Sequence, residues 1–447
     1  MQISVKKFKS GERYVLLLDD DGVPDFWVTH FVTQRLRMDK AATSIEQYLK
    51  DIKHLKLWES INNRDLLEEI YQGKVPSRKD LDDLKEHCTY KAKALKVNSK
   101  SNVVDMSKFH LSTTEDMPTV RKPQYINRVT NIAEFLHFVG QERVKHKATS
   151  AKLFAELDQM KKLLKRGLSR VRLRKFSLDK TGIPDGAFED FIEVAKPRHI
   201  YNPFKNPVVK IRNYLIIQTL YESGLRCSEL LALQIGDISS DIDDPRLFVE
   251  RRHDNKDDPR LRQPTAKTLG RGVPISSELR ELLYIYIKQH RTQTKIAKTH
   301  PYIFVSHKAK KGSYETGAPI VQRTVNDLFA KIVAINPERF IHITPHSYRH
   351  FFNDQLSAQI DEEKRTIKEE VKRLEKAQRY EEAKQYGHEN TITEQRELEI
   401  RAELNGHSSL ESGRYYLKRT AKRQATRIRN KMHEALKHKV ERVDDGK

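Results

Sequence analysis

Four short stretches in the second half of the chain carry side chains that can act together on a phosphate. Arginine guanidinium groups offer forked hydrogen-bond donors to anionic oxygens. A neutral imidazole can accept a proton near pH 7, and a phenol becomes a nucleophile once its proton is drawn off. In chain order the side chains are Arg226, Lys267, His346, Arg349, His407 and Tyr416.

The first two stretches place a guanidinium and an amine in short local motifs. Arg226 precedes Glu229 by three residues, so on a helix the carboxylate can hold the guanidinium. Lys267 falls in a turn-rich run, 265–275, from which a lysine can reach into a cleft. Each motif alone is commonplace, because surface ion pairs and basic turns are abundant.

The third and fourth stretches each contain a histidine. Pro345 suits the start of a helix on which His346 and Arg349 share a face and can bind one anion. A capped helix with two exposed polar groups is the commoner meaning of such a stretch. The fourth stretch contains the pair Gly406 and His407.

Two tyrosines follow that pair. Tyr416 lies nine residues after His407, and Tyr415 directly precedes it. Taken in this order, the whole set resembles the active-site signature of the tyrosine recombinases, the phage integrase family. The resemblance covers about residues 185–420 and, more loosely, the helical runs before residue 58.

The chain departs from the family pattern at three points. Asn405 stands where the family usually has an apolar residue, and residues 411–414 replace a frequent threonine-containing run. The interval between Arg349 and His407 is longer than usual, because it holds a charged insertion that a looped-out hairpin can absorb. None of these changes removes a chemical group.

The resemblance implies DNA strand cleavage that needs no metal, cofactor or ATP. Tyr416 attacks the phosphate and forms a 3′-phosphotyrosine, and Lys267 protonates the departing 5′-oxygen. The phenol of Tyr416, with an ordinary pKa of about 10, keeps its proton near pH 7 and is then a weak nucleophile. The resemblance implies that His346 accepts this proton or hydrogen-bonds the phosphate. The donors to the non-bridging oxygens are Arg226, Arg349 and His407, and Glu229 supports Arg226.

Two other tyrosines compete for the role of nucleophile. Tyr415 is one residue from the family spacing and points about 100° away if the segment is helical. Tyr348 lies between His346 and Arg349, where packing is its simpler role. We therefore expect Tyr416 to be the nucleophile.

The elements that must position these residues are mainly helical with a small β-sheet, an α+β class. Alternating apolar residues predict a hairpin within residues 2–18, and strands near 247–250 and 273–275. Apolar residues at helical spacing predict helices elsewhere, one of them ending at Gly140. The expected helices lie within 26–36, 43–58, 66–97, 126–139, 152–168, 185–195, 209–221, 277–289, 321–333 and from 347 onward.

These elements divide into two domains. We expect an N-terminal hairpin extension at 1–22, a helical core-binding DNA-binding domain at 23–168, a basic linker at 169–180 and a mixed α/β catalytic domain at 181–447. The catalytic domain carries the charged helical insertion, 361–403, and a basic tail.

The insertion has a thin apolar seam at Ile367, Val371 and Leu374, which suits a narrow helix pair. Gly387 can break it into a projecting antiparallel hairpin. A solvated helix extension without a partner explains the composition equally well.

The linker is expected to lie along a phosphate backbone, although a solvated charge run is the alternative. The expected DNA-contacting residues, which include one arginine of the turn-rich run, are Arg170, Arg172, Arg174, Lys175 and Arg271.

Composition supports a polyanionic partner. The 447 residues include 84 lysines and arginines against 62 acidic residues, a net charge of +22. Double-stranded DNA leads; RNA, ribosome association or a membrane surface remain alternatives on charge alone. Cys88 and Cys227 form neither a metal motif nor a disulfide framework, and the apolar run 14–18 is too short for a signal or a span. We expect a cytoplasmic, nucleoid-associated protein without membrane contact.

The resemblance implies a site-specific recombinase or integrase that acts as a homotetramer on synapsed DNA, with an accessory DNA-bending protein or second recombinase as a further candidate partner. Two other functions stay open. A catalytically silent DNA-binding regulator on the same fold is disfavoured by the intact catalytic positions. A type IB topoisomerase-like or resolvase activity shares the chemistry, and supercoil relaxation without paired sites would favour the topoisomerase.

Overall fold

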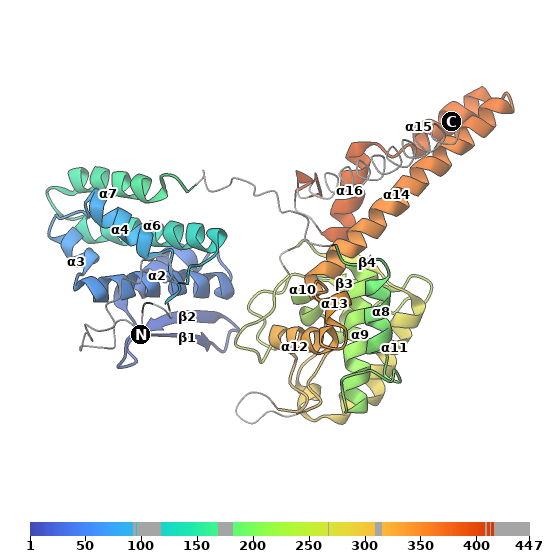
Figure 1. Ribbon diagram of the computed structural model, residues 1–447, viewed down its shortest axis with the longest axis horizontal. Helices are drawn as coiled ribbons and strands as arrows, with labels where there is room; N and C mark the ends of the chain where they lie inside the picture. The colour runs from blue at the N-terminus through green and yellow to red at the C-terminus, as the bar shows by residue number, and fades with distance from the viewer. Residues whose placement is uncertain are drawn as a thin grey trace, which may run out of the picture. The chain divides into compact units, whose positions relative to one another are not determined.

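The computed structural model describes residues 1–92, 95, 118–168, 182–266, 268–308, 315–406, 409–411 and 413–414. The chain forms two compact units, Met1–Lys180 and Thr181–Lys447. Figure 1 shows their elements.

The first unit begins with a β-hairpin. Strands β1 (Gln2–Lys7) and β2 (Arg13–Leu18) pair antiparallel, with Val5 opposite Val15. Alternate residues of β2 are buried, so Val15 and Leu17 join the helical core of the unit. The hairpin is therefore packed into the unit.

The helices of the first unit surround one apolar core. Leu49 and Leu55 of one long helix and Phe135 of another are fully buried in it. The elements are α1 (Phe26–Phe31), the π-helical turn η1 (Val32–Leu36), α2 (Ala42–Asn62), α3 (Leu66–Tyr71), α4 (Arg78–His87), α6 (Lys122–Val144) and α7 (Ser150–Lys165).

The prediction that a helix ends at Gly140 is wrong, because α6 continues to Val144. A Cβ atom at Gly140 would lie 3.0 Å from Leu157 Cδ2 and 3.5 Å from Ile70 Cγ2. The glycine thus lets α7 and α3 pack closely against α6.

The second unit is built around α9, whose Leu215, Ile216 and Leu220 are fully buried. Asn206 caps this helix by accepting a hydrogen bond from Val209 N, and Pro207 occupies the first turn. The elements before the last helices are α8 (Ala187–Ala195), α9 (Pro207–Ser223), α10 (Cys227–Ala232), η5 (Ile235–Asp237), β3 (Arg246–Val249), β4 (Arg271–Pro274), α11 (Ser277–Gln289), η6 (Arg291–Gln293), η7 (Ile296–Thr299), α12 (Gln322–Val333) and α13 (Pro337–Phe340).

Three helices complete the described part of this unit: α14 (Pro345–Lys376), α15 (Tyr380–Asn390) and α16 (Glu394–Asn405). A capping box between Thr344 and Ser347 starts α14. Helix α15 runs back along the outer part of α14, and the two form a projecting hairpin (Figure 1).

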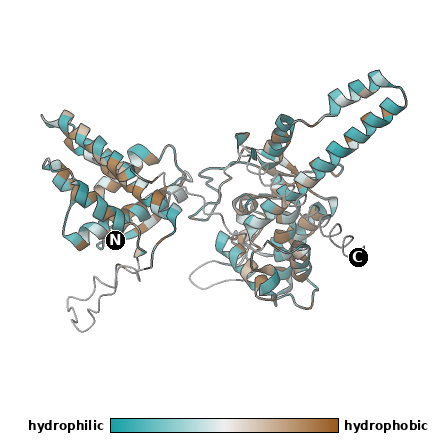
Figure 2. Cartoon of the chain, turned by 45° about the horizontal axis from the view of Figure 1, so that its top comes forward, coloured by the Kyte–Doolittle hydropathy of each residue, from teal (hydrophilic) through white to brown (hydrophobic). Residues whose placement is uncertain are grey.

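The surface of this hairpin is largely hydrophilic (Figure 2), and a narrow seam that includes the buried Ile367 and Ala383 holds it together. The break predicted near Gly387 is wrong. The turn contains Gln378, whose φ is +62°, and Gly387 lies inside α15, where a Cβ atom would be 3.5 Å from Val371 Cγ2. Close helix packing explains a glycine there.

The expected α+β class is confirmed, although the strands of the described residues form two separate two-stranded antiparallel sheets, β1–β2 and β3–β4. Among the described residues, no helix combines the length and apolar character required to cross a membrane.

We predict that Ala383→Arg separates α15 from α14 without unfolding the rest of the second unit. Placing a charged side chain at this buried position costs on the order of 2 kcal/mol, because the side chain must either lose its hydration or push the two helices apart. Limited proteolysis is expected to cut the hairpin faster, while the main thermal transition stays in place. Gln385→Arg introduces the same side chain at an exposed neighbouring position and is expected to behave as wild type. If protease cut both variants equally fast, the seam would not be what holds α15 against α14.

Candidate active site

Arg226 is held at the start of α10 by a buried carboxylate. Glu229 accepts hydrogen bonds from the backbone N of Arg226 at 2.9 Å and from its Nη1 at 3.2 Å. The Arg226 side chain is 32% exposed, whereas that of Glu229 is fully buried. The guanidinium is therefore fixed on its protein side and open to an anion on the other.

Glu229 also connects α10 to the turn-rich run before β4. Its Oε1 accepts from Thr268 Oγ1 at 2.6 Å, and its Oε2 accepts from Arg271 Nη2 at 3.1 Å. Burial opposes ionisation of Glu229, but the charge of Arg271 and the hydrogen bonds from Thr268 and Arg226 outweigh it, so the pKa of the carboxyl lies below its ordinary 4.5. The ionised carboxylate is the form that this network stabilises.

Arg271, expected to contact DNA, is buried and directed into the protein. Its Nε donates to Leu404 O at 2.9 Å and its Nη1 to Thr268 Oγ1 at 2.9 Å, in addition to the bond with Glu229. A surface contact with a phosphate does not fit this arrangement. The side chain instead ties the end of α16 to β4 and α10.

The turn at Gly406 is fastened to the same run. Leu269 N donates to Gly406 O at 3.1 Å. Gly406 has a φ of +64°, and a Cβ atom there would lie 2.7 Å from Arg271 Nη1 and 2.9 Å from Leu269 O. Only glycine combines the left-handed backbone with this close approach.

Arg349 joins the remaining stretches. From α14, its Nη1 donates to Gly224 O at 3.1 Å and its Nη2 donates to Asn405 O at 2.9 Å. Gly224 precedes Arg226 by two residues, and Asn405 precedes His407 by two. Arg349 is only 1% exposed, so in this arrangement its guanidinium organises the backbone.

Both arginines act electrostatically on His346. Partial desolvation of its imidazole and the positive charges of Arg349 and Arg226 lower its pKa below the ordinary 6.5. Its ring centroid lies 4.5 Å from that of His350, in an edge-to-face arrangement. The structure thus brings Arg226, His346 and Arg349 together from α10 and α14.

The rival Tyr348 is buried in the core. Its ring centroid lies 4.9 Å from that of Phe188, and burial raises the pKa of its phenol well above 10. A buried, neutral phenol fits packing and not nucleophilic attack.

Several predicted site residues lie outside the part of the chain that the structure describes: Lys267, His407, Tyr415, Tyr416, Arg170, Arg172, Arg174 and Lys175. Their described neighbours Thr268 and Gly406 belong to the network around Glu229 and Arg271.

Sequence reasoning missed two polar residues of this region. Thr268 contacts Glu229 across 39 positions, and Asn353 contacts Asn405 across 52. No local spacing signals such pairs, although the unusual asparagine at 405 indicated that something polar faces it.

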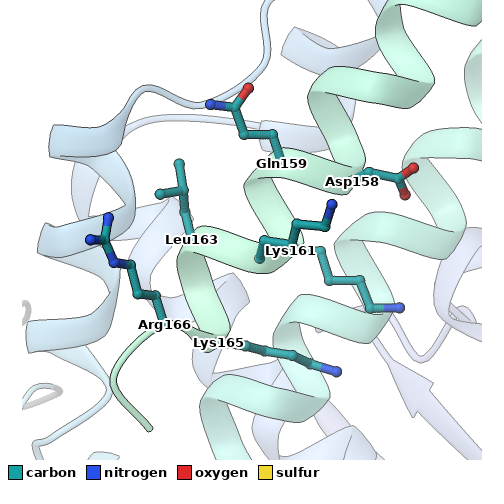
Figure 3. A pocket seen from close by; sticks show the side chains of 7 residues that line it. Asp158, Gln159, Lys161, Leu163, Lys165 and Arg166 are labelled. Atoms are coloured by element: carbon teal, nitrogen blue, oxygen red, sulfur yellow. The ribbon is translucent and has the colours of Figure 1, made fainter.

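A hollow on the first unit contains none of these residues. It is lined along α7 by Asp158, Gln159, Lys161, Lys162, Leu163, Lys165 and Arg166 (Figure 3). Lys161 and Lys165 both form ion pairs with Glu134, which partly neutralises the positive charge there.

Residues 191–364, which contain Arg226, His346 and Arg349, match the model of the phage integrase family. Tyrosine recombinase XerD of Proteus mirabilis is 25% identical over 217 residues, covering 47% of this chain and 60% of that protein. The middle of the chain is thus similar to the phage integrase family.

A second relative is similar to a comparable extent. Tyrosine recombinase XerC of Staphylococcus epidermidis is 27% identical over 155 residues, which cover 33% of this chain and 40% of the relative. The chain thus matches less than two thirds of the length of these integrase-family proteins.

The chain superposes on solved recombinase structures with low TM-scores. The XerH site-specific recombinase bound to palindromic difH substrate, a post-cleavage complex, has a TM-score of 0.43 at 14% identity, covering 90% of this chain and 94% of that chain. The Tn1549 transposon integrase in complex with circular intermediate DNA has a TM-score of 0.37 at 16% identity, with 83% and 93% covered.

We predict that Arg271→Lys destabilises the second unit by roughly 2 kcal/mol, because one ammonium cannot replace the fork that serves three separate partners. Thermal unfolding and DNA-binding titrations check this, and the folded variant is expected to keep wild-type DNA affinity. Arg251→Lys, at an exposed position, is the control. If Arg271→Lys bound DNA more weakly but kept the thermal stability of the wild type, Arg271 would be a DNA contact after all.

Proposed function

We propose that this protein is a tyrosine-type site-specific DNA recombinase that cuts and rejoins DNA through a 3′-phosphotyrosyl intermediate at Tyr416, without metal or ATP. The observation that carries the proposal is the position of Arg349, which hydrogen-bonds the backbone beside Arg226 and the backbone beside His407. Arg349 thereby joins three of the four stretches, and the bonds from Arg271 to Leu404 and from Leu269 to Gly406 attach the other one.

Arg226 is the group best presented to DNA. Its exposed guanidinium can donate two hydrogen bonds to the non-bridging oxygens of a phosphate while Glu229 holds it from behind. Arg349 is buried without DNA, so its share in phosphate binding requires the groups that cover it to shift when DNA binds. His407 is the third proposed donor.

The proton transfers are assigned to two further groups. His346 is suited to accept the Tyr416 proton or to hydrogen-bond the phosphate, because its lowered pKa keeps the imidazole neutral at pH 7. Lys267 is proposed to protonate the 5′-oxygen as it leaves. The phosphotyrosine retains the energy of the phosphodiester, so a 5′-hydroxyl can reverse the step.

The rest of the chain is proposed to hold DNA. The first unit would act as the core-binding domain, with Arg170, Arg172, Arg174 and Lys175 along the phosphate backbone. We propose a homotetramer on two synapsed duplexes of nucleoid DNA, with an accessory DNA-bending protein or a second recombinase as a further partner. The net charge of +22 supports a polyanionic partner.

Tyr416→Phe is expected to abolish covalent DNA attachment and to leave DNA binding within about twofold, because the substitution removes only the nucleophilic oxygen. DNA duplexes that bind the full chain are first enriched from a random library. Nicked versions of these duplexes then trap the covalent adduct. Denaturing gels and peptide mass spectrometry locate it.

Tyr415→Phe is the matched control and is expected to keep the adduct. An adduct that survives in Tyr416→Phe would overturn the assignment. Relaxation of supercoiled DNA without paired sites would instead identify a topoisomerase, and DNA binding with no wild-type adduct would identify a silent regulator.

The pH dependence of adduct formation tests His346. A folded-state pKa below 6.5 means that the neutral imidazole persists as the pH falls from about 8 to 6.5, and the rate is expected to decline only below 6.5. His346→Gln should lower the rate and remove this acidic decline, whereas His388→Gln, on the exposed face of α15, should retain it. A decline centred above 6.5 would contradict the role.

A further inference from the structure

Asn353 of α14 and Asn405 of α16 form a reciprocal pair of amide hydrogen bonds. Asn353 Nδ2 donates to Asn405 Oδ1 at 3.0 Å, and Asn405 Nδ2 donates to Asn353 Oδ1 at 2.9 Å. Their exposed fractions are 1% and 0%. Two buried amides in this geometry can satisfy one another only when the helices face each other in one alignment.

Each amide is also anchored to its own helix. The second N–H of Asn353 donates to Arg349 O at 2.8 Å, and the second N–H of Asn405 donates to Arg401 O at 3.0 Å. All four amide hydrogens therefore have a partner, and neither side chain can rotate without losing its three hydrogen bonds.

The same polar alignment continues along both helices away from the site. Arg401 Nη2 donates to Ser357 Oγ at 2.8 Å, and Lys364 Nζ donates to Glu397 Oε2 at 2.6 Å. Positions 405, 401 and 397 of α16 thus meet 353, 357 and 364 of α14 in antiparallel order. A slip of one turn, about 5.4 Å, would break all of these contacts.

The pair is directly connected to the candidate site. The backbone oxygen of Asn405 accepts from Arg349, and Gly406, which follows, is bonded to Leu269. An apolar residue at 405 would pack against α14 in more than one alignment, whereas a buried polar pair specifies one.

We infer that Asn353 and Asn405 are positioning residues that fix the register of α16 on α14, and through it the location of the Gly406 turn against Arg349. The expected effect of the pair on DNA cleavage rests on the proposed function, whereas its effect on the register does not.

Two readouts on the full chain test it. Hydrogen exchange of the Leu269 amide and of peptides covering 402–406 reports the Gly406 turn without DNA, and adduct formation at saturating nicked DNA reports catalysis. Asn405→Leu is expected to accelerate this exchange and to slow adduct formation, each by about tenfold, because it leaves the Asn353 amide buried without its partner.

Asn213→Leu is the matched control, since Asn213 is 1% exposed in α9 and accepts from Arg212 at 2.7 Å. It is expected to lower thermal stability but to leave exchange at Leu269 and the rate of adduct formation unchanged. If Asn405→Leu does not fold, Asn353→Ser takes its place, because it shortens one partner without adding bulk. Its hydrogen exchange and its rate of adduct formation are then compared with those of the wild type.

The double variant Asn353→Leu/Asn405→Leu distinguishes an effect on the register of α16 from an effect on thermal stability. Two facing leucines are expected to recover most of the thermal stability, yet the exchange stays fast and the adduct slow. Wild-type exchange and wild-type rate in the stable double variant would overturn the inference. If wild type forms no adduct at all, the proposed function fails, while the exchange data still decide whether the pair positions the turn.

Discussion

A buried guanidinium must find acceptors, and this requirement organises the second unit. Arg349 satisfies it with the carbonyl groups of Gly224 and Asn405, at the ends of α9 and α16. Arg271 does the same with Glu229, Thr268 and Leu404. Each arginine gathers chain segments that are distant in sequence, because helix ends and turns are where backbone carbonyls lack local partners. The assembly of the site and the burial of these charges are one event.

Much of the fold could be predicted because local patterns agreed with it. Ser277–Gln289 and Gln322–Val333 follow their apolar periodicity closely, and Ser276 caps the former by accepting from Leu279 N. Glycines were harder. Gly140 and Gly387 suggested helix breaks, yet both lie inside helices, since a neighbouring helix occupies the space that a side chain would fill. That neighbour is not visible in the local sequence.

The candidate site was predictable at the level of residue types and order, and less so in the direction of each side chain. Arg226 and Glu229 pair as their spacing indicates. Arg271 resembles a surface arginine in sequence, but a carboxylate 42 positions away and the carbonyl of Leu404 draw it inward. Long-range partners of this kind decide whether a charge faces solvent or core, and no short motif encodes them.

The hairpin has a consequence for engineering. It leaves the unit along α14 and returns along α16, and these two helices are already joined below it by Ser357 with Arg401 and Lys364 with Glu397. The tip, around Gln378, lies beyond both of these contacts, at the end of α14 opposite to His346. The tip is therefore a place to attach a fluorophore, an affinity tag or a guest domain at a distance from Arg226, His346 and Arg349.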